Sequence, residues 1–264
     1  MANTKSTDLE SGSSQYWSIT DGDQTGLDIT GDITIECWIK LESIGADVKV
    51  IASKWSGNTD TNISYDIEYH ESLDKITFNF SPNGTGASQE NLYSDVVNFT
   101  TGVWYHIAVT FDASTSTAIF YIDGSSVNSD TGSATSIYNG TAPFVVGARL
   151  NNGSSVIKFF DGLIDEVRVW NDIRTTSEIS DNYQTELAGT ETGLAGYWKF
   201  NDDGTDSQTA GNNDLTNNNT ATFSSDVPNW STTSIKSING LAYASVKSKN
   251  GLAIADIKSI NGLA

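Results

Sequence analysis

The sequence predicts an all-β protein, a two-sheet antiparallel jelly-roll sandwich with one short helix and a short C-terminal repeat tail. Apolar and polar residues alternate along many segments, and clusters of Gly, Asn, Asp and Ser separate these segments. Alternation with period two indicates strands that bury one face. Many short strands joined by turns are typical of sandwiches and jelly rolls.

The alternation is clearest in "DITIECWIKL", where Ile33, Ile35, Cys37, Ile39 and Leu41 fall on one side. Seven other segments are predicted strands: "NISYDIEYH", "KITFNF", "VWYHIAVTF", "TAIFYI", "FVVGARL", "GLIDEVRVW" and "GLAGYWKF". Asp123-Gly124 after "TAIFYI" predicts a hairpin turn. One helix is expected at 175–187, since Thr175 and Glu178 have the spacing of a capping box.

The chain is expected to comprise a flexible N-terminus at 1–11, a domain at 12–230 and a tail at 231–264. Residues 201–230 are polar, but Leu215, Phe223 and Trp230 punctuate them, which favours a final strand region of the same domain. The tail repeats one phrase three times, with Asn-Gly at 239–240, 250–251 and 261–262. Strands joined at these pairs are favoured over a helix with an eleven-residue period, because each copy would place a glycine inside that helix.

Charge separates the domain from the tail. Residues 1–230 hold 10 Lys and Arg against 32 Asp and Glu, a net charge of −22, whereas residues 231–264 hold four Lys against one Asp, a net charge of +3. An acidic domain repels phosphate backbones, so no nucleic-acid partner is expected. No segment approaches the length of a membrane span, and the first residues lack the pattern of a secretory signal. The single cysteine, Cys37, is expected in the core.

Five phrases resemble the laminin G-like domains of the concanavalin A-like jelly-roll superfamily, which also includes pentraxins. They are "ITIECWIKL", "GVWYHIAVTFD", "AIFYIDG", "FDGLIDEVRVWN" and "LAGYWKFND", in family order across roughly residues 12–225. The resemblance implies two curved antiparallel sheets and a domain that binds glycans or proteins, often with Ca²⁺. The tail resembles "IxKxNGxA" repeats that end structural proteins of bacteriophages.

The resemblance also suggests site residues. The first pentraxin ligand loop is similar to "SGNTDTN", with Asp60 and Asn62 as oxygen ligands, but the second has Arg149, Leu150 and Asn151 in place of acidic residues. A pentraxin-type site is therefore not expected. A structural Ca²⁺ is predicted instead near "TDGD" and "FDGLIDEV", held by Asp21, Asp23, Asp161 and Asp165.

Aromatic residues near polar loops are candidates for stacking on sugar rings, while Asp and Asn bind the hydroxyls. With Asp60 and Asn62, the expected ligand-binding residues are Trp55, Tyr93 and Tyr138. The tryptophans within strand phrases, Trp38, Trp104, Trp170 and Trp198, are interpreted as core residues.

No enzymatic activity is expected. Some hydrolases of the superfamily place Glu, Asp and Glu at alternating positions of one strand, and "YDIEYHE" offers only Asp66 and Glu68 on one face because Glu71 falls on the other. His106 is interpreted as a structural histidine. The sequence contains no recognisable zinc site or nucleophile elbow.

These observations favour a non-enzymatic virion structural protein, a head-decoration or tail-fibre component. Its jelly-roll domain is expected to bind glycans or a host cell-surface receptor. Its tail at 231–264 is expected to bind other virion proteins or to form a homo-oligomer, with assembly in the host cytoplasm. The alternatives are a bacterial extracellular adhesion or carbohydrate-binding module and, third, a glycoside hydrolase.

Overall fold

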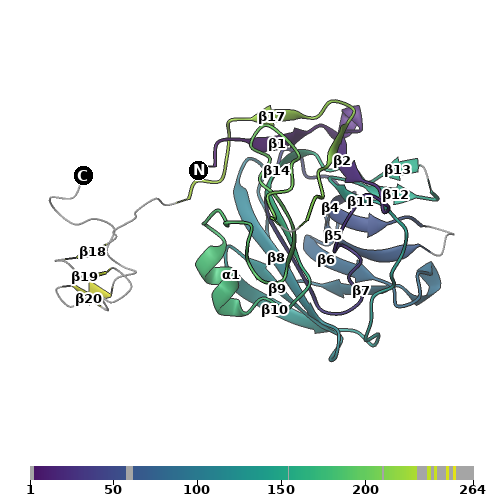
Figure 1. The fold of residues 1–264 in the computed structure, drawn as a ribbon, viewed down its shortest axis with the longest axis horizontal. Helices are drawn as coiled ribbons and strands as arrows, with labels where there is room; N and C mark the ends of the chain where they lie inside the picture. The colour runs from purple at the N-terminus through teal and green to yellow at the C-terminus, as the bar shows by residue number, and fades with distance from the viewer. Residues whose placement is uncertain are drawn as a thin grey trace. The chain divides into compact units, whose positions relative to one another are not determined.

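The computed structural model describes residues 3–57, 62–153, 155–209 and 211–230, and four two-residue strands of the tail. The chain divides into two units, Met1–Pro228 and Asn229–Ala264. The first unit is an antiparallel two-sheet sandwich, which confirms the predicted fold class (Figure 1). Within the described ranges it contains a single α-helix.

Sheet A has the strand order β10-β9-β8-β3-β14-β1-β17. Its strands are β1 (Ser6–Leu9), β3 (Ile33–Leu41), β8 (Trp104–Asp112), β9 (Thr117–Ile122), β10 (Ser125–Thr131), β14 (Gly162–Trp170), β15 (Leu194–Trp198) and β17 (Thr222–Ser224). Strand β14 changes partner along its length, since its first residues pair with β1 and its last residues with β15. A bulge between Asp165 and Arg168 marks the change.

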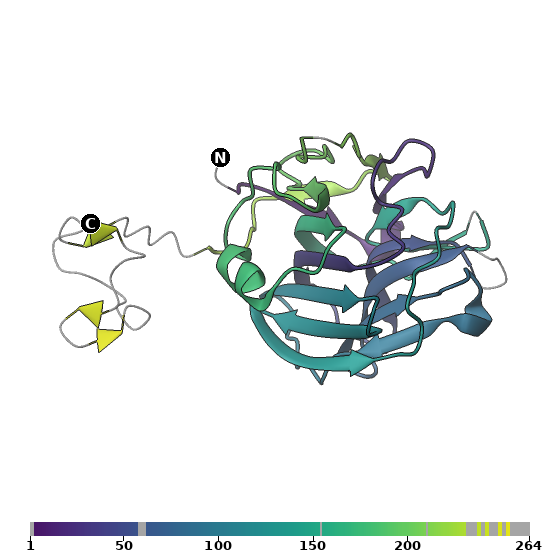
Figure 2. The same cartoon turned by 60° about the horizontal axis from the view of Figure 1, so that its bottom comes forward.

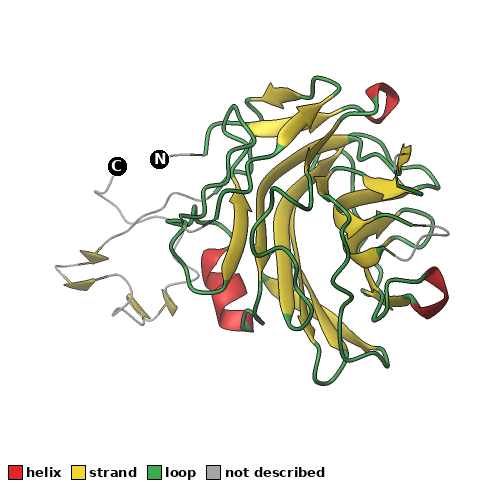
Figure 3. Cartoon of the chain, turned by 45° about the vertical axis from the view of Figure 1, so that its right-hand side comes forward, coloured by secondary structure: helices red, strands yellow, loops and turns green. Residues whose placement is uncertain are grey.

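Sheet B has the strand order β16-β2-β11-β4-β5-β6-β7. Its strands are β2 (Tyr16–Ile19), β4 (Val48–Trp55), β5 (Ile63–His70), β6 (Lys75–Phe80), β7 (Glu90–Tyr93), β11 (Phe144–Val146) and β16 (Thr216–Asn218). A separate hairpin is formed by β12 (Arg149–Asn151) and β13 (Ser155–Ile157). Two short 3-10 helices, η1 (Ser11–Ser13) and η2 (Gly86–Ser88), lie in connecting loops (Figure 3).

The predicted alternation sets the core between the sheets. All five alternate residues of β3, from Ile33 to Leu41, are fully buried, including the free thiol of Cys37. The sheets meet through aromatic rings, and the centroids of Phe80 on β6 and Phe111 on β8 are 4.6 Å apart. The core therefore consists of the inward faces that period two predicts.

Local turn and cap chemistry also follows the sequence. Asp123 and Gly124 have φ angles of 48° and 75° between β9 and β10, as a two-residue hairpin turn requires. Helix α1 (Thr176–Asn182) begins at a capping box of Thr175 and Glu178 and is shorter than the predicted 175–187.

A buried arginine binds two carbonyls at and just beyond the end of the helix, where helical carbonyls lack partners within the helix. The Arg168 guanidinium donates to the carbonyls of Asn182 (3.1 Å) and Thr185 (2.6 Å). Ile179 of α1 packs against Ala108 and Tyr121, so the helix covers the outer face of sheet A (Figure 2).

A buried ion network lies beneath this helix. Arg168 contacts Glu166 at 2.9 Å and Glu36 at 3.5 Å, and His106 Nε2 lies 3.2 Å from Glu36. Burial opposes the charge of Glu36, but Arg168 and His106 outweigh it and lower the pKa of Glu36 to about 2. His106 is 1% exposed and has a fixed partner, which suits the interpretation as a structural residue.

The ends of the domain differ from the expectation at one point. The predicted flexible segment 1–11 contains β1, which pairs with both β14 and β17, and Leu9 is fully buried. A four-residue strand has too few positions to show a period, so the sequence did not reveal it. Residues 201–228 form part of the first unit and place β16 and β17 in opposite sheets.

In the second unit, short antiparallel strands flank two of the Asn-Gly pairs. Strand β18 (Ser237–Ile238) pairs with β19 (Leu241–Ala242), and β20 (Ser248–Lys249) pairs with β21 (Leu252–Ala253). The strand interpretation expected nine-residue strands between the Asn-Gly pairs, whereas each of the described strands has two residues. The third copy, at 257–264, lies outside the described residues.

In the part of the chain that the structure describes, no helix combines the length and the apolar character needed to cross a membrane.

Candidate functional site

Polar side chains form two rows across the outer face of sheet B. Because Tyr65, Ile67 and Tyr69 point into the core, Asp66 and Glu68 of β5 point outward. The strand register places Asp66 beside Asn79 and Glu68 beside Thr77, and Thr77 in turn beside Tyr93. We call Asp66, Glu68, Thr77 and Asn79 the polar face. All four residues are at most 5% exposed.

Arg149 of the β12–β13 hairpin lies over the polar face. Its Nη1 atom is 2.7 Å from Asp66 Oδ2 and 3.3 Å from Glu68 Oε2, and its guanidinium lies 4.8 Å from the centroid of the Trp55 ring. Burial and the neighbouring Asp66 raise the pKa of Glu68 to about 7, against the attraction of Arg149 and Lys158. The surroundings of Glu68 therefore disfavour its charged form.

This arrangement is not that of a free pair of catalytic carboxylates. A retaining glycosidase uses one carboxylate as nucleophile and the other as acid. Here Asp66 and Glu68 both accept from one nitrogen of Arg149, and Asp66 also accepts from Asn79 at 2.7 Å. In this geometry, oxygen lone pairs that the chemistry requires are engaged by protein donors.

An open hollow of about 420 Å³ lies next to the polar face, where β4 begins and β13 has ended. It is lined by Ser11, Ala46, Asp47, Val48, Lys49, Lys158 and Phe159, and we call it the lysine hollow. Its volume is in the range of small-molecule sites. Phe159 is half-buried, and its ring centroid lies 6.2 Å from that of Tyr16.

Lys158 connects the hollow with the polar face. Its side chain is 29% exposed, and its ammonium lies 3.9 Å from Glu68 Oε2, beyond hydrogen-bond distance. Burial lowers the pKa of Lys158, against the attraction of Glu68. Its backbone has a φ of 58° and its carbonyl accepts from Val50 N at 3.0 Å, so an unusual conformation is fixed beside β4.

The second lysine of the hollow has a closer partner. Lys49 Nζ is 3.4 Å from Glu71 Oε1, and both side chains are at most 9% exposed. Glu71 also accepts from the backbone N–H of Asp47 at 2.9 Å. Asp47 itself is exposed and lines the lysine hollow.

Of the predicted ligand-binding residues, Asn62 and Tyr138 lie near each other beside Gly140, but Trp55 and Tyr93 do not join them in an open site. Trp55 lies in β4 and is 1% exposed, so its ring is not accessible to a sugar. The guanidinium of Arg149 packs over that ring instead. Tyr93 borders the polar face beside Thr77. Asn62 bonds to Thr141 in another loop, and Tyr138 is half-buried, its N–H donating to Ser81 O. Asp60 lies outside the described residues.

The predicted metal ligands have protein partners. Lys54 Nζ is 2.5 Å from Asp21 and 3.0 Å from Asp28, and it donates to the Ala142 carbonyl at 2.8 Å. A buried ammonium therefore binds Asp21 of the "TDGD" turn. Asp23 accepts from Thr20 at 2.6 Å.

The other two predicted metal ligands are also occupied by protein donors. Burial opposes ionisation of Asp161, but donors from Ser43 and Ser11 outweigh it and lower its pKa. Asp165 is fully buried, accepts from Asn3 at 2.6 Å, and has its pKa raised by burial and by Glu166.

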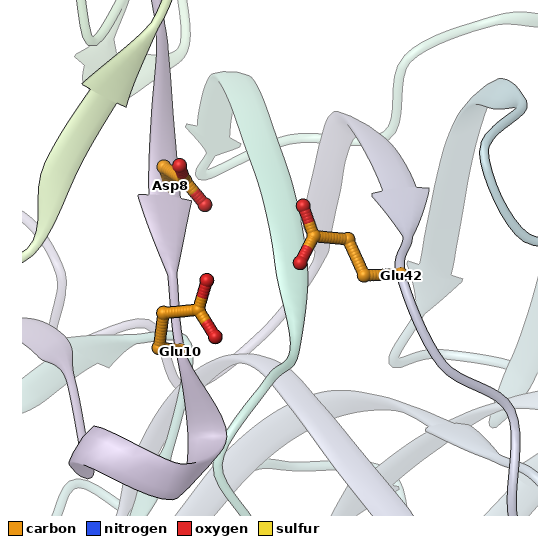
Figure 4. A group of neighbouring side chains, drawn as sticks. All are labelled: Asp8, Glu10 and Glu42. Atoms are coloured by element: carbon orange, nitrogen blue, oxygen red, sulfur yellow. The ribbon is translucent and has the colours of Figure 1, made fainter.

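Within the described ranges, three other carboxylates make up the one group whose oxygens lie close enough together to share a cation. Asp8, Glu10 and Glu42 each place an oxygen within 4.8 Å of the others (Figure 4). Burial and the charges of Asp8 and Glu10 raise the pKa of Glu42. Oxygen-rich groups of this kind suit Ca²⁺. Either a bound cation or protonation of Glu42 would relieve the repulsion between the three carboxylates. Spacing in the sequence did not reveal the group because β1 was not predicted.

The lysine hollow was not predictable from local sequence patterns. Residues 155–161 show no regular period, and Lys158 is separated from Lys49 by more than a hundred residues. Arg149 stood out in the sequence as a basic residue at a position where the related pentraxin loop is acidic. The structure gives that difference a role, because Arg149 binds Asp66 and Glu68.

Comparisons with known proteins place this fold in a family. Residues 11–180 match the concanavalin A-like lectin/glucanases superfamily, and the chain belongs to it. A search of curated proteins found no match.

Two solved structures share the fold at low identity. One is a protein from Bacteroides ovatus that is considered carbohydrate-binding, with a TM-score of 0.59 and 20% identity over 85% of this chain. This chain spans 60% of that protein's chain. The other is a heptameric pentraxin from Limulus polyphemus, with a TM-score of 0.58, 14% identity, and coverage of 83% of this chain and 93% of the pentraxin.

Proposed function

We propose that the protein is a non-enzymatic glycan-binding protein whose ligand occupies the lysine hollow. The observation that carries the proposal is the combination of an open hollow, a half-buried aromatic ring at Phe159 and hydrogen-bonding groups from Ser11, Asp47 and Lys158. Sugar rings stack on aromatic faces while their hydroxyls bind polar side chains. Membership of a superfamily named for lectins and glucanases supports the same class of ligand.

The engagement of Asp66 and Glu68 by Arg149 favours binding over hydrolysis. Ligand and protein would meet at the hollow rather than on the covered polar face, because the polar-face residues are buried beneath the Arg149 hairpin or beside it. The protein therefore holds a saccharide without cleaving it.

A glycan array with the full chain tests this proposal. The wild type is expected to bind at least one saccharide, and Phe159→Ala is expected to weaken that binding about 2- to 10-fold through loss of the ring. Tyr138→Ala serves as the comparison, since Tyr138 lies in a different loop and does not line the hollow. Loss of binding in Tyr138→Ala with Phe159→Ala unaffected would move the site to the loops. Absence of any binding would refute the glycan ligand.

The proposal extends to a role in a virion, where the domain contacts a host-surface glycan and residues 231–264 attach to other virion proteins or to copies of the chain. The tail's net charge of +3 against −22 for residues 1–230 supports a separate attachment role. An extracellular carbohydrate-binding module is the alternative, and it shares the glycan ligand.

Two measurements test the assembly role. Light scattering is expected to give the mass of an oligomer for the full protein and the mass of a monomer for a chain that stops at Trp230. Monomer masses for both chains would contradict self-assembly through the tail. Mass spectrometry of particles purified from the source of the gene is expected to detect the chain. Its absence from those particles would favour the extracellular alternative.

A further inference from the structure

We propose that the lysine hollow selects an anionic sugar, one that carries a carboxylate or sulfate group, and that the Lys158 ammonium binds this group. The inference rests on the proposed glycan-binding function and specifies its ligand class.

The ammonium of Lys158 has donors that the described residues do not use. An ammonium has three N–H donors, and the buried Lys54 satisfies them with Asp21, Asp28 and the Ala142 carbonyl. Among the described residues, Glu68 is the one acidic partner within 4 Å of the Lys158 ammonium, at 3.9 Å, while Asp66 and Asp47 attract it from farther away. A partly buried cation without close acceptors is a favourable partner for an anion that enters the hollow.

Lys158 shares its nearest carboxylate with a second cation, because Arg149 lies closer to Glu68 than Lys158 does. Glu68 already accepts from Arg149, and burial together with Asp66 raises its pKa, which opposes its negative charge. Lys49 adds a second cation to the wall, although Glu71 lies 3.4 Å from it. Asp47 is the one carboxylate among the lining residues, and it is exposed at the rim, where water screens it.

The concentration of cations here contrasts with the rest of the domain. Residues 1–230 contain ten Lys and Arg against 32 Asp and Glu, yet two of the ten line this one hollow. An anionic ligand would be repelled by most of the surface and attracted at this point.

The backbone at Lys158 also indicates a functional position. A φ of 58° is unfavourable for a residue with a Cβ atom, and glycine or asparagine is the usual choice there. Strained residues of this kind concentrate at ligand sites, where the surrounding structure holds them. Here the bond from Val50 N fixes the lysine so that its side chain lines the hollow.

A matched set of probes tests the inference by calorimetry on the full chain. The probes are a galacturonic acid trimer, its methyl ester and a sulfated galactose trimer. The acid trimer and the ester differ only in charge, and the sulfated trimer distinguishes a sulfate from a carboxylate. The wild type is expected to bind the acid trimer, the sulfated trimer or both more tightly than the ester.

Lys158→Gln is expected to weaken binding of the favoured anionic probe about 10- to 100-fold while binding of the ester changes little. Lys158→Arg is expected to retain most of the affinity. Lys75→Gln is the control, since Lys75 lies at the start of β6 and does not line the hollow. Thermal melts of each variant verify folding.

Two results would overturn the inference. One is equal affinity for the ester and both anionic probes, which would leave a neutral glycan site intact. The other is unchanged anion binding in folded Lys158→Gln. Binding of none of the three probes, with no binding on the glycan array, would refute the proposed function as well.

Discussion

Replacing Lys158 by glycine is expected to stabilise the protein while removing its ligand affinity. A residue with a Cβ atom in the left-handed region costs about 1–2 kcal/mol, and the φ of Lys158 is 58°. Glycine loses about 0.5–1 kcal/mol more conformational freedom on folding than other residues. The net gain in the free energy of unfolding is therefore between about 0 and 1.5 kcal/mol, with a midpoint of about 0.75 kcal/mol. For a chain of this size the midpoint corresponds to a melting temperature higher by about 1–4 °C.

Urea unfolding and calorimetry at pH 7 measure this gain, and Lys158→Ala is the matched control. Alanine also removes the ammonium but keeps the Cβ atom, so the glycine variant is expected to exceed the alanine variant by about 1 kcal/mol. Both variants are expected to lose binding. A glycine variant less stable than the wild type by more than about 1 kcal/mol would show that the Lys158 side chain stabilises the fold. That result would contradict the view that Lys158 is kept for ligand binding despite its unfavourable backbone conformation.

Four other predictions concern the charged groups. Because the pKa of Glu42 is raised in the folded state, its repulsion appears as the pH rises, so Glu42→Gln is expected to raise stability at pH 8 but not at pH 4. Millimolar Ca²⁺ is expected to raise the melting temperature of the wild type more than that of Glu42→Gln; an equal response would remove this group as the ion site. Lys54→Met is expected to cost about 1–3 kcal/mol in urea unfolding, because it leaves carboxylates and a carbonyl without their donor; a cost below about 0.5 kcal/mol would contradict this. The pKa of Glu36 is lowered from 4.5 to about 2, so its ionisation contributes about 3 kcal/mol of stability above pH 4.5. That contribution is lost as the pH falls toward 2. Glu36→Gln is expected to abolish this part of the acid dependence of stability, and an unchanged dependence of stability on pH would refute the prediction.

The sequence predicted the sandwich because period two is a local property that each long strand displays. The alternate residues of β3 are buried in the core, and Asp123-Gly124 forms its hairpin turn. Strand β1 escaped prediction because four residues show no period, and its place in sheet A comes from β14 and β17, more than 150 residues away.

The candidate site was less predictable because it depends on contacts between distant segments. Trp55 was expected to be exposed since polar residues follow it, but β4 continues through it and Arg149 covers its ring. Asp21 was predicted to be a metal ligand from its local sequence. The sequence did not reveal that the ammonium of Lys54, 33 residues further on, binds its carboxylate. No local pattern distinguishes Lys158 from an ordinary surface lysine, because its meaning depends on the hollow around it.

The central claim is that a saccharide binds in the lysine hollow. An NMR titration of the full, isotopically labelled chain with the saccharide bound most tightly on the array tests it most directly. The claim predicts that the largest amide shift changes lie at residues 46–49 and 158–159, on either side of the hollow. Shift changes centred on the loops of Asn62 and Tyr138, with those residues of the hollow unaffected, would contradict it.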